Sequence, residues 1–554
     1  MALLINQDYL TPNFQKSWSN SPEEPENNEV KSEKDPALIT DPFRCSALPN
    51  FIDFSQCDLV KNGSGDGKNG LSSSCVPKHK ETYLDQLRDE LKILEFHEKK
   101  NDLYNFRQSI DLHNVNSPAI QSFKQLFTGQ VKSWLQELTG IELDDRVAMT
   151  ASAYSYGDHL LCHDDELENR RIAYTFYLTP NWTETDGGRL DLFSSDDKLR
   201  PLEVVHSIVP TENMLAFFEV VPKSFHQVSE VTSQDKTRWS INGWFHGATL
   251  ERPKQQTVSL PKRVDPCFFE YDDLLLWINP IYFDPETQAS IRQQVEEKSE
   301  IQLHQFLQTD RYDLVMAELN MPDLGWKRKG PWNRRNYLSL DDGSQLDPNR
   351  FPNLSRCLAL MKSEAIYVLL SQLTNMRLHP LYQEDSEDES DEEADGDAKE
   401  PPLKKRANEK SGEPSTSASG TSAEVEKVEM DPSPCELELR KFEPGSYTVL
   451  SDDDFRARAE SGESLALSVQ LYFTSHDWDT KHGGYTCFIE KDSSEELLTV
   501  TPSGNSLALV CSESGTEKFI KYISRRAIDD FGATPYFADI CGTYYEVTPS
   551  QCGE

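Results

Sequence analysis

The sequence predicts a mainly β protein with flanking helices (α+β), made of two jelly-roll domains of which the second lacks a metal site. Short stretches rich in β-branched and aromatic residues recur at regular spacing between residues 171 and 245, which is typical of a sandwich or jelly roll. Part of this pattern returns at residues 471–484, after a long acidic tract. The length of 554 residues exceeds what one hydrophobic core organises, so two or three domains are expected.

Five stretches of the first domain are predicted to be strands. Arg171 to Thr179 has the composition of a buried strand, and Gly187-Gly188 is a hairpin signal before the next one. The four further strand candidates are Arg189 to Phe193, Asn213 to Val220, Phe225 to Val231 and Arg238 to Phe245. Apolar residues at helical spacing predict a helix at Tyr83 to Phe96, and a second helix is expected at Phe123 to Leu138. These helices would brace the sheet.

Three residues form a candidate metal site. His163 and Asp165 lie two residues apart, so on an extended backbone their side chains point the same way. His226 adds a second imidazole from a later strand. Two histidines and one carboxylate on one face, with the other positions open, are the ligand set of non-haem Fe(II) oxygenases. An isolated His-x-Asp pair is more often a surface or helix-cap feature, but the strands around this pair favour the metal site.

Arg238 follows His226 by twelve residues, in the stretch T-R-W-S-I-N-G-W-F. Together with His163-x-Asp165, this pattern resembles the 2-oxoglutarate/Fe(II) oxygenases with a double-stranded β-helix, of the prolyl hydroxylase type. The stretches L-L-C-H-D-D-E-L-E, D-G-G-R-L-D-L-F, F-F-E-V and S-F-H-Q-V-S-E-V narrow the resemblance to the ribosomal prolyl 3-hydroxylases related to the termination-and-polyadenylation protein. It covers most of the chain from about Asp41 to the end, apart from the low-complexity segments.

The resemblance implies a role for each candidate residue. The three metal ligands would be the catalytic residues, Arg238 would bind the far carboxylate of 2-oxoglutarate, and Tyr177 and Tyr154 would hydrogen-bond this cosubstrate. Fe(II), 2-oxoglutarate, O2 and ascorbate (vitamin C) are the implied cofactors. A guanidinium group suits a carboxylate, because it donates two parallel hydrogen bonds. The structural alternatives are a surface ion pair for Arg238 and a core position with a satisfied hydroxyl for each tyrosine.

The composition excludes several classes of protein. No apolar run reaches the roughly 18 residues of a membrane helix, and the N-terminus lacks the basic and apolar regions of a secretory signal. Eleven cysteines without C-x-x-C spacing suit reduced thiols of the cytoplasm or nucleus. The formal charge of -38 opposes binding to naked nucleic acid and favours a basic partner, such as a ribosomal protein.

The expected organisation follows from shifts in composition along the chain. A disordered segment is expected at 1–40, followed by a catalytic domain at 41–250 with a mobile Gly/Ser-rich insertion at 56–80. A linker at 251–266 then leads to a second domain at 267–550, which an acidic disordered segment interrupts at 384–433. Helices are expected in the second domain at Pro285 to Phe306 and Pro352 to Leu373. Lys404-Lys405-Arg406 is a candidate nuclear localisation signal, although so short a basic run usually has no function.

An internal repeat relates the two domains. Phe176 to Gly188 returns as Leu471 to Gly484 with one extra residue, and Gly157 to Asp165 aligns with Gly445 to Asp453 without a gap. This register predicts an equivalent in the second domain for each site residue of the first. His163 corresponds to Ser451, Asp165 to Asp453, His226 to Ile520 and Arg238 to Ala538. One carboxylate cannot hold iron alone, so the second domain is expected to bind no metal and to serve packing or partner binding.

The resemblance also implies the reaction: hydroxylation of a prolyl residue at C3 in a small-subunit ribosomal protein, with an effect on translation. One competing hypothesis is an oxygenase that acts on nucleic-acid bases. That family has a second arginine six residues after the first, where this chain has Trp244. The other competing hypothesis is a non-enzymatic, oxygen-linked scaffold that acts through the second domain and the acidic segment. Neither the modified proline nor the oligomeric state follows from the sequence.

Overall fold

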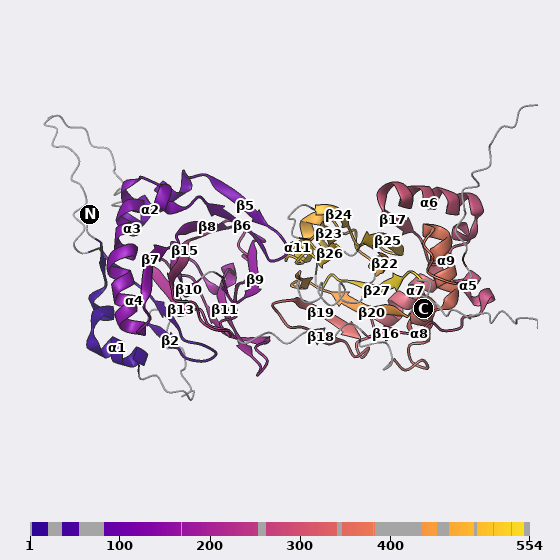
Figure 1. Ribbon diagram of the computed structural model, residues 1–554, viewed down its shortest axis with the longest axis horizontal. Helices are drawn as coiled ribbons and strands as arrows, with labels where there is room; N and C mark the ends of the chain where they lie inside the picture. The colour runs from indigo at the N-terminus through magenta and orange to yellow at the C-terminus, as the bar shows by residue number, and fades with distance from the viewer. Residues whose placement is uncertain are drawn as a thin grey trace, which may run out of the picture.

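The computed structural model describes most of the chain. The described residues are 3–19, 36–54, 82–167, 169–252, 262–340, 346–380, 382, 434–450, 465–491, 496–513, 515–532 and 534–547. The expected insertion at 56–80, the acidic segment at 384–433 and the basic run at 404–406 lie outside these residues, as does most of the linker at 251–266. Figure 1 shows two lobes side by side, with the helices at the two far ends and the strands in between.

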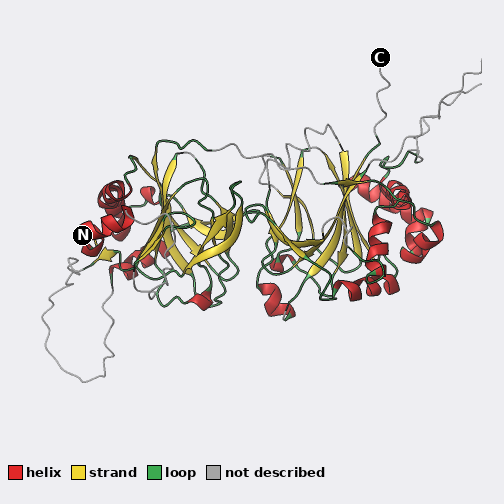
Figure 2. Ribbon diagram, turned by 90° about the horizontal axis from the view of Figure 1, so that it is seen from below, coloured by secondary structure: helices red, strands yellow, loops and turns green. Residues whose placement is uncertain are grey.

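The N-terminal half is built on an antiparallel sheet in the order β12-β11-β14-β9-β6-β8-β15-β10-β13-β3-β2. Its strands are β1 (Leu4–Ile5), β2 (Ala37–Ile39), β3 (Cys45–Leu48), β4 (Ile52–Asp53), β5 (Phe96–Lys100), β6 (Tyr104–Ser109), β7 (Leu143–Val147), β8 (Thr150–Tyr154), β9 (His159–His163), β10 (Arg170–Tyr177), β11 (Leu190–Ser195), β12 (Pro201–Ile208), β13 (Met214–Glu219), β14 (His226–Val228) and β15 (Arg238–Gly247). The sheet curls around an interior, as is typical of the jelly roll (Figures 1 and 2).

Helices cover the outer face of this sheet. They are α1 (Pro12–Ser19), α2 (Tyr83–Lys92), α3 (Pro118–Leu126) and α4 (Lys132–Thr139), and a π-helical turn (Phe127–Val131) joins α3 to α4. Phe123 and Phe127 of this helical stretch pack against Phe176 of β10, with ring centroids 5.2 and 6.2 Å apart. Alternate residues of β10 therefore point outward into this core, and those in between point into the interior of the curled sheet.

The structure corrects part of the predicted disordered segment at 1–40, of which residues 1–2 and 20–35 lie outside the described residues. Residues 3–19 are ordered: β1 pairs with β4, and four apolar side chains of this segment are buried, namely Leu3, Ile5, Tyr9 and Trp18. The Tyr9 hydroxyl donates to the Pro49 carbonyl at 2.6 Å. A few anchoring apolar residues in an otherwise polar stretch are enough to dock it, which a reading of overall composition misses.

The helix predictions are mostly confirmed, with errors at the ends. α2 ends at Lys92, and β5 begins where the predicted helix was to end. The helix predicted from Pro285 to Phe306 is wrong in its last third, because α6 (Pro285–Lys298) ends at Ser299 in a left-handed conformation and strand β17 (Glu300–His304) follows. The prediction at Pro352 to Leu373 covers two helices, α8 (Pro352–Met361) and α9 (Glu364–Thr374).

The C-terminal half repeats the strand pairing of the N-terminal half. The order β25-β22-β27-β20 repeats β13-β10-β15-β8, and β24-β23-β26 repeats β12-β11-β14. Its strands are β16 (Arg263–Val264), β17, β18 (Lys327–Lys329), β19 (Arg335–Leu340), β20 (Cys435–Phe442), β21 (Tyr447–Thr448), β22 (Leu465–Phe473), β23 (Thr486–Glu490), β24 (Glu496–Val500), β25 (Ser506–Glu513), β26 (Thr516–Ile520) and β27 (Phe537–Tyr545).

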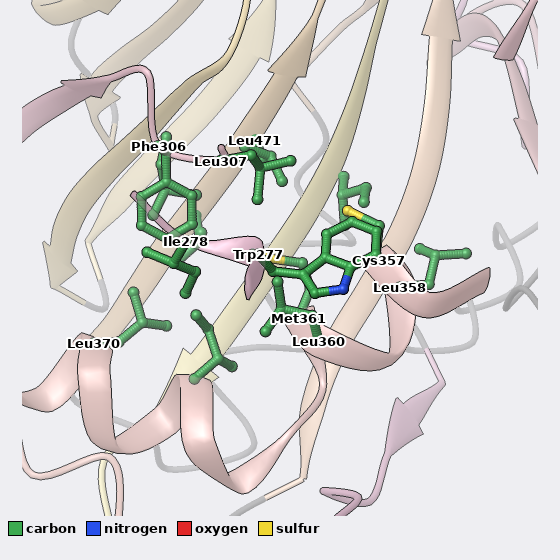
Figure 3. Packing of buried hydrophobic residues seen from close by; sticks show 14 of the residues in the cluster. Trp277, Ile278, Phe306, Leu307, Cys357, Leu358, Leu360, Met361, Leu370 and Leu471 are labelled. Carbon is green, nitrogen blue, oxygen red and sulfur yellow. The ribbon is translucent and has the colours of Figure 1, made fainter. Parts of the chain in front are cut away.

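Helices again cover the outer face of this sheet. Besides α6, α8 and α9 they are α5 (Tyr271–Trp277) and α7 (Thr309–Leu319), whereas the short α11 (Arg526–Phe531) lies at the junction of the two lobes (Figure 1). Figure 3 shows the core between helices and sheet, where Trp277 of α5 and Leu370 of α9 lie near Leu471 of β22. No helix among the residues placed here has the length and apolarity needed to cross a membrane.

The two halves meet through equivalent parts. The turn between β5 and β6 carries Asp102, whose carboxylate accepts a hydrogen bond from the Leu450 N–H at 3.0 Å. The turn between β18 and β19 carries Trp332, which packs against the group that includes Cys162. Leu450 lies five residues after Gly445, and Cys162 lies five residues after Gly157. Both glycines have a positive φ and occupy equivalent places in the two halves. Each half therefore places the same turn against the same strand of the other half.

Candidate metal and cosubstrate site

The curled sheet brings the three predicted metal ligands together. His163 ends β9 and His226 begins β14, and the two residues are direct partners in the antiparallel pairing, with ring centroids 4.2 Å apart. Asp165 adopts a φ of 63°, and its carboxylate lies 3.4 Å from His163 Nε2 and 3.5 Å from His226 Nε2. One ligand atom from each residue lies within 4.8 Å of the others, a spacing that allows all three to bind one ion.

Backbone hydrogen bonds orient both imidazole rings. His163 Nδ1 donates to the Leu161 carbonyl and His226 Nδ1 to the Ser224 carbonyl, each at 2.8 Å. In the neutral form of each ring, which has one proton, Nε2 then holds a lone pair directed toward Asp165. Outer hydrogen bonds of this kind fix the tautomer and ring orientation of metal ligands.

The electrostatics of the three groups favour a bound cation. Burial raises the pKa of Asp165, but the neighbouring His226 and His163 outweigh burial and hold this pKa well below its usual range. Burial and the neighbouring His163 lower the pKa of His226 to about 4, so His226 is neutral at neutral pH, whereas Asp165 outweighs burial and raises the pKa of His163. A buried carboxylate beside a neutral imidazole lone pair is a donor set that a divalent metal completes.

Arg238 is a buried cation with no acidic partner among the residues that the structure describes. It is 2 % exposed at the start of β15, and its Nε donates to the Gly188 carbonyl at 2.7 Å. The rings of Tyr154 and Tyr177 flank its guanidinium group, with centroids 5.1 and 5.0 Å away. An unpaired buried charge is costly, so this position calls for the carboxylate of a ligand.

Polar atoms without partners line the interior next to Arg238. Ser152 Oγ, Tyr177 Oη, Ser240 Oγ, Asn242 Oδ1 and Trp244 Nε1 are buried without hydrogen bonds. Ser240 of β15 pairs with Tyr177 of β10 on one side and with Ser152 of β8 on the other. Because side chains alternate along a strand, Ser240, Asn242 and Trp244 lie on the same face of β15 as Arg238. Since most buried polar groups in proteins are satisfied, this group fits an interior that holds a polar ligand such as 2-oxoglutarate.

Sequence reasoning named six of these site residues and missed four. The structure places Tyr177 with a free hydroxyl in the interior, as a cosubstrate ligand requires. Tyr154 stacks on Phe106 with centroids 4.5 Å apart, and its contact with cosubstrate stays a prediction. The residues for which the sequence predicted no role are Ser152, Ser240, Asn242 and Trp244, although Ser240 belongs to the Arg238-x-Ser240 pattern of the resemblance. Counting every second residue from Arg238 along a strand would have found the last three.

Comparisons with known proteins agree with this geometry. Residues 149–246 match the 2OG-Fe(II) oxygenase superfamily, and residues 269–545 match the oxoglutarate and iron-dependent oxygenase degradation C-terminal family. The mouse prolyl 3-hydroxylase OGFOD1 is 36% identical, with 92% of this chain and 90% of the relative covered. The Xenopus laevis prolyl 3-hydroxylase OGFOD1 is 39% identical, with 84% of this chain and 86% of the relative covered. The chain belongs to this prolyl 3-hydroxylase family.

Family membership makes the chain a 2-oxoglutarate/Fe(II) dioxygenase, whose reactants are 2-oxoglutarate and O2. The residues present fit these groups, because a facial set of ligands, an unpaired buried arginine and free polar atoms lie in one interior. Among solved structures, a Pseudomonas putida prolyl-4-hydroxylase is similar at 20% identity and a TM-score of 0.26, covering 30% of this chain and 87% of its own.

The structure corrects the predicted register of the C-terminal half. Gly188 approaches the Arg238 side chain, and its equivalent Gly484 approaches the ring of Phe537 instead, so Phe537 and not Ala538 stands in the place of Arg238. His226 pairs with the residue four after Gly188, and Lys518 pairs with the residue four after Gly484. Lys518 and not Ile520 therefore takes the place of His226. Ser451 and Asp453 lie outside the described residues.

Side chains of the C-terminal half fill its own interior. Arg440 and Asp539 occupy the places of Ser152 and Ser240 and form a buried bidentate ion pair, with distances of 2.9 and 2.6 Å. Phe442 stacks on Phe537 at 4.9 Å, where the N-terminal half has Tyr154 and Arg238. In this half a buried arginine is therefore paired with a carboxylate of the chain itself, whereas Arg238 has no such partner among the described residues.

This ion pair gives a stability prediction. Asp539→Ala should lower the stability of the C-terminal half by about 3–5 kcal/mol, because it leaves the Arg440 guanidinium buried and unpaired. Urea denaturation followed by far-UV circular dichroism measures the shift of this transition. The exposed Asp477 provides a matched control, and Asp477→Ala should shift the midpoint little. Equal midpoints for the two variants would contradict the assigned role of the pair.

Proposed function

We propose that this enzyme hydroxylates a prolyl residue at C3 in a basic, small-subunit ribosomal protein, and thereby affects translation. The observation that supports an oxygenase of this kind most directly is the combination of the facial ligand set with Arg238 and its free polar neighbours. The names of the mouse and Xenopus relatives support prolyl C3 as the site of reaction. The formal charge of -38 supports a basic partner.

The chain's own residues bind and orient the reactants. His163, Asp165 and His226 would hold Fe(II) on one face and leave the opposite positions open to ligands. Arg238 would fix the far carboxylate of 2-oxoglutarate by charge-assisted hydrogen bonds, and Tyr177 would donate to the same ligand. Orientation by these groups brings the reacting atoms together at low entropic cost.

The interior also keeps the reaction away from bulk water. Tyr154, Tyr177 and Arg238 are nearly fully buried, so the charge of Arg238 acts on the cosubstrate in a medium of low dielectric constant. Bound iron supplies the activation of O2 that cleaves 2-oxoglutarate to succinate and CO2 and places one oxygen atom in a C–H bond of the substrate. The second oxygen atom of O2 leaves in succinate, which balances the reaction.

We further infer that the C-terminal half is a second jelly roll that binds no metal, because its strand pairing repeats that of the first half and its interior is filled. It is proposed to hold the protein substrate. Ascorbate is the proposed reductant that keeps iron as Fe(II), and the cytoplasm and nucleus are the proposed compartments, where ribosomal proteins are made and assembled. The buried, unpaired cysteines of the described residues suit these reducing compartments.

Mass spectrometry tests the substrate. Small-subunit ribosomal proteins purified from cells that lack this chain should gain one oxygen atom at a single proline after incubation with the enzyme, Fe(II) and 2-oxoglutarate. Fragment spectra would locate the proline, and amino-acid analysis would separate 3-hydroxyproline from its 4-hydroxy isomer. A chain with Asp165→Ala serves as the control. Turnover of 2-oxoglutarate without a hydroxylated ribosomal proline would contradict the proposed substrate and leave the oxygenase assignment standing.

A further inference from the structure

Strand β14, which carries the metal ligand His226, is only three residues long. Its neighbours β11 and β9 hold it on both sides, but hydrogen bonds after Val228 fix its far end. Gly188 N–H donates to the Glu230 carbonyl at 3.1 Å, and Val231 N–H donates to the Asp158 carbonyl at 3.0 Å. The position of Glu230 therefore controls where this short strand ends.

The Glu230 carboxylate is bound entirely by the C-terminal half. Tyr522 Oη donates to Glu230 Oε2 at 3.2 Å, and Ser524 Oγ donates to Oε1. The Arg525 N–H donates to both carboxylate oxygens, at 3.0 and 3.1 Å. Three donors from one short segment, 522–525, thus converge on one side chain of the catalytic half.

This carboxylate is partly buried and forms no ion pair within 4 Å among the described residues, although the charge of Arg525 also acts on it. Burial raises the pKa of Glu230, and the hydrogen bonds from Ser524, Arg525 and Tyr522 offset part of that rise. Burying a carboxylate costs free energy, and hydrogen bonds alone recover only part of it. A neutral side chain would join the two halves with a smaller desolvation penalty. We therefore take the role of Glu230 to be the positioning of β14 rather than the stabilisation of the contact between the halves.

The C-terminal half also covers the outer side of the two ligand-bearing strands. Cys162 and Phe225 directly precede His163 and His226, so their side chains point away from the metal site. They form a buried group with Phe193, against which Trp332 of the C-terminal half packs at a ring distance of 5.5 Å. The rigidity of the metal site thus depends on contacts that lie behind it.

We propose that Glu230 is a positioning residue for the metal site: by binding Tyr522, Ser524 and Arg525 of the C-terminal half, it fixes the end of β14 and with it His226. The non-catalytic half thereby sets the metal affinity of the catalytic half. The inference rests on the iron site of the proposed function and is independent of the identity of the substrate.

The C-terminal half supplies a matched control at the interface. Gly484 N–H donates to the Lys521 carbonyl as Gly188 N–H donates to that of Glu230, so Lys521 has the same backbone role, one residue before Tyr522, the equivalent of Glu230 in strand pairing. Lys521 is also buried and also reaches into the other half, where its Nζ donates to the Asn101 carbonyl. Strand β26, which ends just before Lys521, carries no metal ligand among the described residues, so Lys521→Met perturbs the interface without acting on His226.

Mn(II) binding to the full-length chain tests the proposal, since Mn(II) accepts nitrogen and oxygen ligands without turnover. Titrations followed by electron paramagnetic resonance should show that Glu230→Gln raises the Mn(II) dissociation constant about tenfold, the lower range for loss of an outer partner of a metal ligand. Ser524→Ala, more than 290 residues away in sequence, should raise it in the same direction. Lys521→Met should leave it unchanged.

Two further readouts separate positioning from a general loss of stability. Hydrogen exchange should show faster exchange of the amides at 224–231 in Glu230→Gln than in Lys521→Met. At saturating Fe(II), the KM for 2-oxoglutarate should equal that of the parent chain, because Arg238 is untouched. The double variant Glu230→Gln with Ser524→Ala should weaken Mn(II) binding by less than the product of the single effects, because the two groups form one contact.

Equal Mn(II) affinities, within twofold, for the parent, Glu230→Gln and Ser524→Ala would overturn the proposal and leave the iron site intact. If Glu230→Gln fails to fold, Ser524→Ala decides alone, since it removes a single hydroxyl group. Absence of Mn(II) binding by the parent chain would refute the metal site itself and, with it, both this inference and the proposed function.

Discussion

Replacing Asp165 by alanine should abolish the iron-dependent turnover of 2-oxoglutarate. Asp165 provides the only carboxylate of the ligand set and lies within 3.5 Å of both histidine Nε2 atoms. A site that keeps only its two imidazoles holds Fe(II) poorly, so we expect a loss of more than about 100-fold, beyond the range for outer-shell changes. Succinate formation with anaerobically loaded Fe(II) measures this loss.

The neighbouring residue provides the control for this experiment. Asp164 has the same charge, but its carboxylate accepts from Arg252 Nη1 at 3.0 Å and belongs to no ligand set in the described chain. Asp164→Ala should therefore keep most of the turnover. Both variants should melt near the parent temperature, because neither removes apolar core. Turnover in purified Asp165→Ala at the parent rate would refute the assignment of the metal site.

Replacing Arg238 by methionine should raise the KM for 2-oxoglutarate by about 30-fold or more, while the Mn(II) affinity stays within a few-fold of the parent value. Loss of a charge-assisted contact to a buried carboxylate costs about 2–5 kcal/mol, and each 1.4 kcal/mol corresponds to about tenfold. Methionine fills much of the arginine volume between the rings of Tyr154 and Tyr177, so the interior stays packed.

Thermal unfolding gives a second measure of this variant. A ligand present at 100 times its dissociation constant stabilises a protein by about 2.7 kcal/mol, so 2-oxoglutarate should raise the melting temperature of the parent but not of Arg238→Met. Arg200 is an exposed arginine paired with Asp196, and Arg200→Met should behave as the parent does. An unchanged KM in Arg238→Met would mean that Arg238 is structural and that another cation binds the cosubstrate.

The sequence sufficed for the strands and for the ligands because both depend on short-range patterns. The strand predicted from Arg171 to Thr179 is β10 (Arg170–Tyr177), and the predicted Arg238 to Phe245 is β15 (Arg238–Gly247). The spacing paired His163 with Asp165 correctly, but the expected extended backbone is wrong, because β9 ends at His163 and Asp165 has a φ of 63°. Partners such as Ser152 remained hidden, because a serine in a strand has no signal of its own.

The alignment of the two halves failed where a count of residues replaced a knowledge of strand pairing. Strand pairing sets Val228 opposite Leu190 and Ile520 opposite Thr486, each two residues after the second glycine of its turn. The equivalent of His226, two residues before Val228, is therefore Lys518. A one-residue slip moves every side chain of a strand to the other face, so Ala538, one residue from Phe537, points into the outer core.

The two halves stay in contact at low enzyme concentration because one chain joins them. Each half places the same turn, with Asp102 or Trp332, against the same strand of the other, as the subunits of a twofold dimer do. Two separate subunits that met in this way would dissociate at low concentration. A single chain replaces that bimolecular equilibrium by an effective concentration on the order of millimolar. The catalytic half therefore keeps its neighbour however dilute the enzyme becomes.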